Sequence, residues 1–224
     1  MVNIYGISKN HVKLFTDAVF GVAITILAVE LQVPNLDNNG TINSEELDEL
    51  FITFTSYIIS FIVIGLYWIT YHSVFNPIKH TTDLMIWLNL LFLLFIALIP
   101  FSDKLTERYD NNQYSFIFYA TVQILTGLML FLIWQHAVRN GLLLLLGKND
   151  NNSDKGYEDN YLNTLIIKLT FIRTIIIPIV MIISIIISFY YLEIAYVFPA
   201  IIIPISIIIR SVYKNYNELY MKES

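Results

Sequence analysis

Residues 11–34, HVKLFTDAVFGVAITILAVELQVP, place one carboxylate at the head of a long apolar run. No charged residue occurs from Ala18 to Val29, and Asp17 comes directly before this stretch. Such a segment is suited to enter a bilayer as a helix, where a carboxylate costs free energy unless water or polar groups surround it. Two arrangements stay open for Asp17: an acid solvated at the membrane surface, or a buried acid held by polar groups of other helices.

The composition of the whole chain agrees with a membrane protein. Of 224 residues, 56% are hydrophobic and 14% are charged, against about 25% charged residues in soluble domains. The mean hydropathy is +0.63, so we expect the lipid bilayer to surround much of the chain. The net charge of −5 and the lack of a basic stripe give no indication of a nucleic-acid partner or a soluble substrate. Cysteine is absent, which excludes disulfides and thiol chemistry.

Six apolar segments are long enough, or nearly so, to cross a hydrocarbon core that needs about 20 helical residues. They lie near residues 13–33, 51–73, 84–102, 114–137, 164–189 and 192–211. None alternates in polarity every second residue, as a membrane β-barrel strand does. We therefore predict an all-α, polytopic protein of one domain, residues 1–224, with a polar cytoplasmic loop at 147–162.

The distribution of basic residues predicts the orientation of these spans. Only Lys104 and Arg108 flank the spans on the side that carries neither terminus. The basic residues of the other side are Lys9, Lys13, Lys79, Arg139, Lys148, Lys155, Arg210, Lys214 and Lys222. We expect both termini to be cytoplasmic. The first apolar stretch lacks a basic leader and a cleavage site, so it is predicted to be a retained helix.

The helical phase of the first segment separates two faces. Val22, Ile26 and Val29 fall within about 60° of one another, and Asp17 lies about 140° from Val22. Phe15, Ala18, Thr25 and Val33 extend the apolar face. Gly21 and Ala28 share the side of Asp17, and we predict that this side packs against protein because small residues allow close approach. The apolar face could contact lipid, pack against other helices, or have a functional role beyond packing.

Polar groups in the next two segments are at a depth similar to that of Asp17 in this topology. Trp68 and His72 lie near the cytoplasmic end of the second segment, and Asn89 lies near the start of the third. These three side chains are the candidate partners of the carboxylate if it is held by other helices.

The first three segments resemble a known family. Phe15-Thr16-Asp17, with His11 four residues before Phe15, is similar to a signature of arginine, three residues and Phe-Ser-Asp. That signature begins the first helix of the transmembrane protein 175 family of potassium channels. The runs GLYWITYHSVF, from Gly65 to Phe75, and LNLLFLLFIALIPFSDKL, from Leu88 to Leu105, resemble its second and third helices. Here His11 stands where the family has arginine, and a threonine replaces the serine.

The resemblance implies a homotetramer whose pore is lined by the first helix of each subunit, with potassium as the permeant ion and no cofactor. It implies that Val22, Ile26 and Val29 form an apolar constriction, and that the hydroxyl of Thr25 favours potassium. It also implies that a set of residues holds the first helix against the second and third; in this chain they are His11, Phe15, Thr16, Asp17, Trp68, His72 and Asn89. The TVGYG filter of conventional potassium channels is absent, so a passive, leak-like pore of modest selectivity is expected.

The alternative is a secondary transporter, ion- or proton-coupled, which often carries charged residues and interrupted helices within the membrane. Arg173 and Lys168 in the fifth segment and the prolines of the sixth are compatible with it. Lys168 is more simply a residue that extends to the membrane surface, and Glu30 a residue at the outer mouth. An enzyme is not expected, because no histidine pair has HExxH spacing and no GxSxG motif occurs.

Overall fold

The structure, a computed structural model, describes residues 4–29, 31, 44–109, 112–144, 153–209 and 211; the side chains of 44–46, 48–49, 52 and 153–163 are outside the description. The helices are α1 (Lys9–Val29), α2 (Ser44–Phe75), α3 (Asp83–Arg108), α4 (Gln113–Arg139), α5 (Ser153–Ser188) and α6 (Leu192–Val197). A 3-10 turn, η1 (Phe198–Ile201), follows α6, and residues 202–209 are again α-helical. The described part of the chain holds no strand beyond an isolated bridge between Ile78 and Leu143.

Among the described residues, six helical spans are long and apolar enough to cross a membrane, which confirms the predicted number. The sixth runs over Leu192–Ile209 and is interrupted by η1 at Pro199, because proline lacks the amide that a regular α-helix needs. The predicted loop at 147–162 is wrong in its second part, since α5 begins at Ser153. A helix once nucleated gains one hydrogen bond for each residue added, and this outweighs the loop preference of the Asn and Asp residues there.

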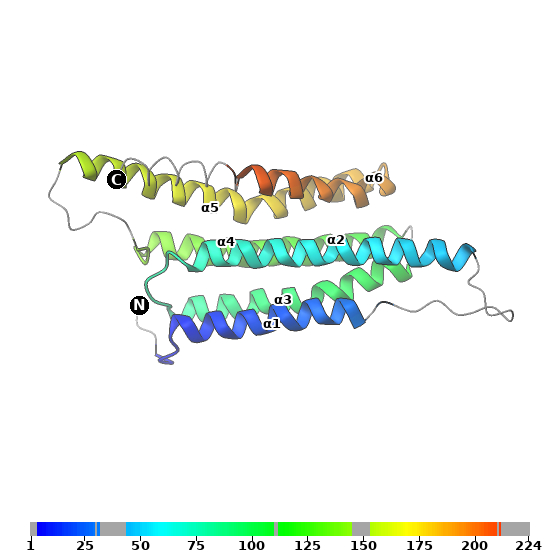
Figure 1. Cartoon of the computed structure of the whole chain (residues 1–224), viewed down its shortest axis with the longest axis horizontal. Coiled ribbons are helices and arrows are strands. Elements are labelled where there is room, and N and C mark those ends of the chain that lie inside the picture. Colours follow the sequence, from blue (N-terminus) through cyan, green and yellow to red (C-terminus); the bar gives the residue numbers. More distant parts are fainter. Residues whose placement is uncertain are drawn as a thin grey trace.

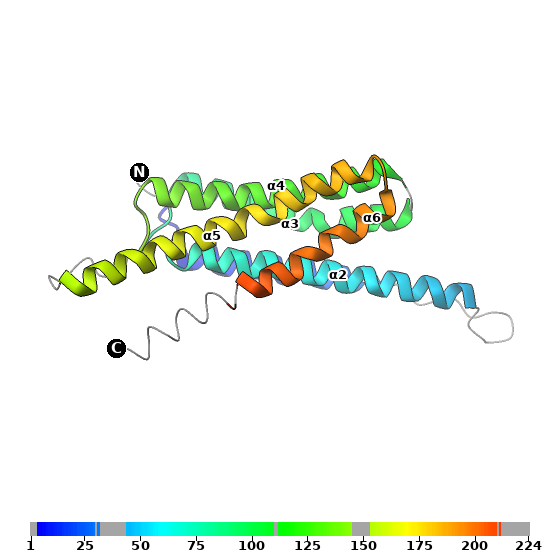
Figure 2. The ribbon, with the colours of Figure 1, turned by 90° about the horizontal axis from the view of Figure 1, so that it is seen from above.

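The helices form three layers that run along the same axis (Figures 1 and 2). α1 and α3 lie on one side, α2 and α4 lie in the middle, and α5 and α6 lie on the other side. α3 packs on α4, α4 packs on α5, and α1 contacts both α2 and α3. The start of α5 extends beyond the ends of the other helices (Figure 1).

Aromatic rings join α1, α2 and α3 in the core. The ring of Tyr71 stacks on that of Phe92, with centroids 5.8 Å apart and planes 6° apart. Phe20 of α1 reaches the same group, with its ring centroid 5.9 Å from that of Phe92. All three side chains are fully buried, so a large apolar residue of α1 is inserted between α2 and α3.

The turn between α2 and α3 organises one end of the bundle, the end predicted to be cytoplasmic. It pairs with the segment after α4, because Lys79 N donates to Leu142 O at 2.8 Å and Leu144 N donates to Pro77 O at 2.6 Å. Thr82 caps α3 by accepting from Met85 N. The turn thus links three helices, and it also receives the start of α1.

Candidate functional site

One face of α1 packs inside the protomer. Its buried residues are Val12, Thr16, Phe20, Ala23 and Leu27. Their spacing of three or four residues keeps them on a single side of the helix. The two side chains that fill most space, Phe20 and Leu27, bury far more apolar area than any glycine or alanine can, and this face therefore decides how α1 is rotated.

Asp17 is held by two residues of α2. Trp68 Nε1 donates to Asp17 Oδ1 at 2.9 Å. His72 Nε2 lies 3.1 Å from the same oxygen and donates to it when that nitrogen carries the proton. The rings of Trp68 and His72 meet edge to face at 4.5 Å, as expected for residues one helical turn apart. The carboxylate is therefore held by polar groups of another helix, as the second arrangement expects, but its side chain is 38% exposed, so it is not the buried acid of that arrangement.

Asn89 does not bind Asp17, so this part of the prediction is wrong. Its Nδ2 donates to Thr16 Oγ1 at 3.0 Å, and both residues are buried. Neighbouring residues of a helix point about 100° apart, so Thr16 faces α3 while Asp17 faces α2. Two consecutive polar residues thus attach α1 to two different helices and fix its rotation.

His11 and Phe15 do not hold α1 against α2 and α3, contrary to expectation. Phe15 is 55% exposed. His11 Nδ1 lies 3.1 Å from Ser8 Oγ, at the start of its own helix. Both residues lie on the outward side of α1, about 100° or more from the buried Thr16. They belong to the same exposed side of the helix as Val22 and Val29.

Two lysines make contacts with the α2–α3 turn that the sequence did not reveal. Lys9 Nζ donates to Asn76 O at 2.9 Å and to Ile78 O at 2.5 Å. Lys13 Nζ donates to Asn76 Oδ1 at 2.9 Å. The sequence showed these lysines only as charges that orient the chain. Their spacing of four residues, which places both on one helix face, was the available signal.

The apolar stripe of α1 faces out of the protomer. Val22, Ile26 and Val29 are 57%, 41% and 84% exposed. Thr25 lies beside them, and its Oγ1 donates to Val22 O at 2.8 Å. The hydroxyl proton is therefore directed to the helix backbone, and the oxygen keeps lone pairs with which it can accept or coordinate.

Gly21 and Ala28 are also exposed, so the prediction that their side packs within the protein is wrong for the protomer. A Cβ atom added at Gly21 would meet no atom within 4 Å. The reason is the same rotation: the buried face is centred on Thr16 and Phe20, and Gly21 lies about 140° from Thr16. α1 consequently presents both its apolar stripe and its small residues to whatever surrounds the protomer.

Arg173 of α5 is tied to α2 as well. Its Nη1 donates to Ser73 Oγ at 2.8 Å, and Ser73 lies two residues before the end of α2. The guanidinium is therefore level with the end of α2.

Comparisons with known proteins agree with this arrangement. A family model described as "Endosomal/lysosomal potassium channel TMEM175" matches residues 11–100, a range that contains Asp17, Trp68, His72 and Asn89. The chain is 29% identical over 139 residues to a potassium channel of Streptomyces collinus, covering 60% of this chain and 67% of that protein. It is also 29% identical over 142 residues to a potassium channel of a Chryseobacterium species, covering 63% and 69%.

The fold has a counterpart among solved structures. The crystal structure of a lysosomal potassium-selective channel TMEM175 homolog from Chamaesiphon minutus superposes with a TM-score of 0.66 at 18% identity, over 90% of this chain and 96% of that one. The six spans and this likeness define a polytopic helical membrane protein with the fold of a channel subunit. Together with the sequence matches, they show that the chain is similar to the TMEM175 family of ion channels, whose model matches residues 11–100.

Proposed function

We propose that this chain is the subunit of a passive cation channel with a modest preference for potassium. Four copies surround a pore lined by α1, in a prokaryotic cell membrane with both termini in the cytoplasm. The observation that carries the proposal is the asymmetry of α1. Thr16 and Asp17 attach it to α3 and α2, while Val22, Ile26 and Val29 stay exposed on another side.

The exposed stripe has the chemistry of an apolar constriction. Branched side chains from several copies of α1, brought together on one axis, narrow a pore and resist its wetting. An ion that crosses such a ring has to shed or rearrange water. Potassium is hydrated more weakly than sodium, so it crosses at lower cost. The lone pairs of Thr25, one residue from Ile26, offer partial compensation near the narrowest level.

The hydrogen bonds that hold α1 in the protomer are suited to a helix that lines a pore. An isolated helix with so much exposed surface could rotate, and rotation would move Val22 and Ile26 away from the axis. The ties of Asp17, Thr16 and the two N-terminal lysines prevent this, because they join α1 to α2, to α3 and to the turn between them. In this proposal Asp17 is a positioning residue and does not bind the ion.

The first test is the reversal potential of purified protein in a planar bilayer with potassium on one side and sodium on the other. A current that reverses toward the potassium equilibrium potential is expected. A current carried by protons, visible as a reversal that follows an imposed pH gradient, would contradict the potassium preference. Saturable, coupled flux in liposomes without current would contradict the channel and favour the secondary transporter.

A substitution locates the constriction. Ile26→Ser is expected to raise the conductance and lower the preference for potassium over sodium, because a hydroxyl wets the ring. Ile172→Ser is the control, since Ile172 of α5 is 46% exposed and Ile26 is 41% exposed. If Ile26→Ser conducts with unchanged conductance and selectivity, Ile26 does not lie at the constriction.

The tetramer is tested separately by the mass of the detergent-solubilised complex in native mass spectrometry. Four chains are expected. A conducting dimer would contradict the tetramer, and a conducting monomer would require a pore within the protomer, which the exposed stripe of α1 could not line.

A further inference from the structure

His11 lies on the same side of α1 as the apolar stripe. At 100° per residue, His11 is in line with Val29 and about 20° from Val22. His11 is exposed, as are Val22 and Val29. If this side of α1 lines the pore, as proposed above, His11 faces the pore as well. A helix rises 1.5 Å per residue, so His11 lies about 16 Å from Val22, toward the predicted cytoplasmic end.

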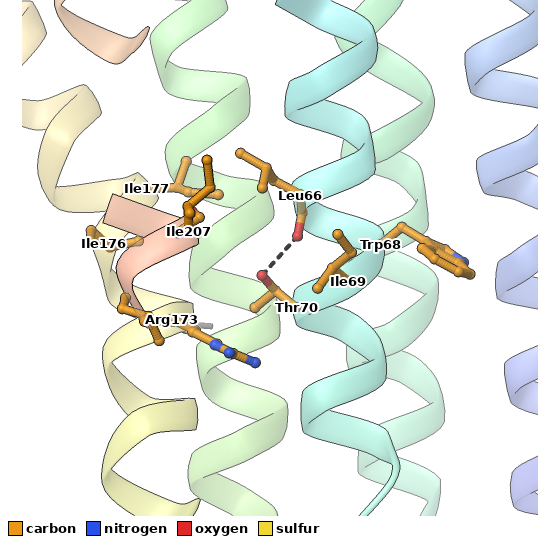
Figure 3. Close-up of a pocket in the computed structure, with 10 residues that line it drawn as sticks. Leu66, Trp68, Ile69, Thr70, Arg173, Ile176, Ile177 and Ile207 are labelled. Atoms are coloured by element: carbon orange, nitrogen blue, oxygen red, sulfur yellow. Dashed lines mark hydrogen bonds between the residues drawn. The ribbon is translucent and has the colours of Figure 1, made fainter. Parts of the chain in front are cut away.

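Along the described length of α1, no other titratable residue shares this side. Lys9 and Lys13 lie about 160° from His11, and Asp17 lies about 120° from it. The two lysines donate to the turn between α2 and α3. Asp17 accepts from Trp68, whose ring extends from α2 toward α1 (Figure 3). The charges of α1 are thus bound to neighbouring elements, and His11 alone stands on the outer side.

The elements packed against α1 carry further titratable groups, but these lie on its other sides. α2 and α3 contact α1 through the sides that carry Asp17 and Thr16. The titratable residues of α2, of α3, of the turn between them and of the segment before α1 near this end are Tyr5, Tyr71, His72, Lys79, His80 and Asp83. Within the described part of the chain, none of them makes a hydrogen bond or an ion pair with His11. A proton added to His11 therefore brings a charge that no acidic side chain there offsets.

The imidazole of His11 is bonded at one nitrogen and open at the other. Ser8 Oγ accepts from His11 N at 3.3 Å and lies 3.1 Å from His11 Nδ1. A hydroxyl that accepts from the backbone keeps its proton for Nδ1, so this geometry suits a neutral ring with its proton on Nε2. No described residue is hydrogen-bonded to Nε2. Histidine is the side chain whose charge changes between about pH 5 and 8, and here a second proton would enter at Nδ1.

We infer that four His11 side chains, one from each subunit, form a ring at the cytoplasmic mouth of the pore and control the entry of cations by their charge. The inference rests on the proposed tetramer with a pore lined by α1. Neutral rings leave the mouth open to potassium. Protonated rings surround the axis with up to four positive charges, and a basic ring lowers the local concentration of cations. Acidification on the side of the termini therefore reduces the potassium current.

The test is the potassium conductance of purified protein in planar bilayers, with the pH changed on the side of the N-terminus. From about pH 8 to about pH 5.5, the conductance of wild type is expected to fall on the order of threefold in about 0.1 M salt. The fall should shrink in about 1 M salt, where the Debye length is about 3 Å. His11→Gln is expected to abolish it, and His11→Arg to keep the conductance low at both pH values.

His80→Gln is the matched control, because His80 is exposed at the same end but belongs to the turn between α2 and α3. It is expected to retain the response of wild type. A response that persists in His11→Gln would overturn the inference and would point to His72 beside Asp17. A wild type without any response would overturn it too. So would a response that is unchanged in about 1 M salt, since a structural change is not screened.

Cross-linking tests the position of His11 without any current. The chain contains no cysteine, so His11→Cys introduces a single thiol per subunit. Mild oxidation is expected to give disulfide-linked dimers of His11→Cys but not of His80→Cys. Equal cross-linking of the two variants, or none in His11→Cys, would overturn the ring.

The two measurements together separate this inference from the proposed function. Cross-linked His11→Cys with a wild type that passes no potassium current would refute the proposed function, and with it the control of conduction by His11. Potassium current without the cross-link, or without the pH response, would refute this inference alone.

Discussion

α1 and α4 are both apolar membrane helices, but the structure uses them differently. α4 buries residues along its whole length, from Ser115 to Ala137, between α3 and α5. α1 buries a single face and leaves the rest exposed. It compensates with hydrogen bonds to α2, to α3 and to the turn between them. The contrast is between a helix that is packed along its whole length and a helix that packs by one face, has a few polar ties to its neighbours and is open on its outer side.

The largest effect is expected within α1 itself, between its two faces. Leu27→Ala should lower the free energy of unfolding by about 2–5 kcal/mol, because Leu27 is 3% exposed and its loss leaves a cavity. Val29→Ala should change it by less than about 0.5 kcal/mol, since Val29 is 84% exposed. The measurement is denaturant unfolding in detergent under conditions that dissociate any oligomer. Equal costs at the two positions would mean that the assignment of faces is wrong.

A smaller effect is expected where α4 meets α5. A Cβ atom at Gly127 would lie 2.6 Å from Pro178 Cδ and closer still to Cγ. Proline is rigid, so Gly127→Ala should cost about 1–3 kcal/mol of stability through overpacking. Gly65→Ala on α2 is the control, because a Cβ atom there meets no atom within 4 Å. Thermal unfolding of the two variants tests whether α4 is held by packing; similar melting temperatures would contradict it.

The smallest effect on stability is expected at the tie of α1 to α2. Trp68→Phe removes the donor to Asp17 and should cost about 0.6–1.7 kcal/mol, the range of hydrogen bonds between membrane helices. Trp87→Phe serves for comparison, since Trp87 is similarly exposed and makes no hydrogen bond within the described part of the chain. A double-mutant cycle with Asp17→Asn isolates the pair. Additive losses would show that Asp17 and Trp68 are not coupled.

Much of this organisation could be predicted from the sequence. The six spans follow from apolar length, and Trp68 and His72 were found as partners of Asp17 because the topology places them at the same depth. It was harder to predict which neighbouring helix each side chain faces. Asn89 was assigned to Asp17 but binds Thr16. Gly21 and Ala28 were assigned to a packed side but are exposed. Helical periodicity gives the angles between the residues of one helix. It does not give the positions of the neighbouring helices around that helix.

The sequence by itself determined the six helices of the described residues that are long and apolar enough to span a membrane, because a backbone in lipid has to satisfy its own hydrogen bonds. It also determined the relative positions of the stripe and the carboxylate on the first helix. Only the tertiary structure decided that Thr16 faces α3 and Asp17 faces α2, through partners 73 and 51 residues away. Contacts between residues so far apart in the sequence depend on how whole helices pack. No local sequence pattern shows which side of a helix will face which neighbour.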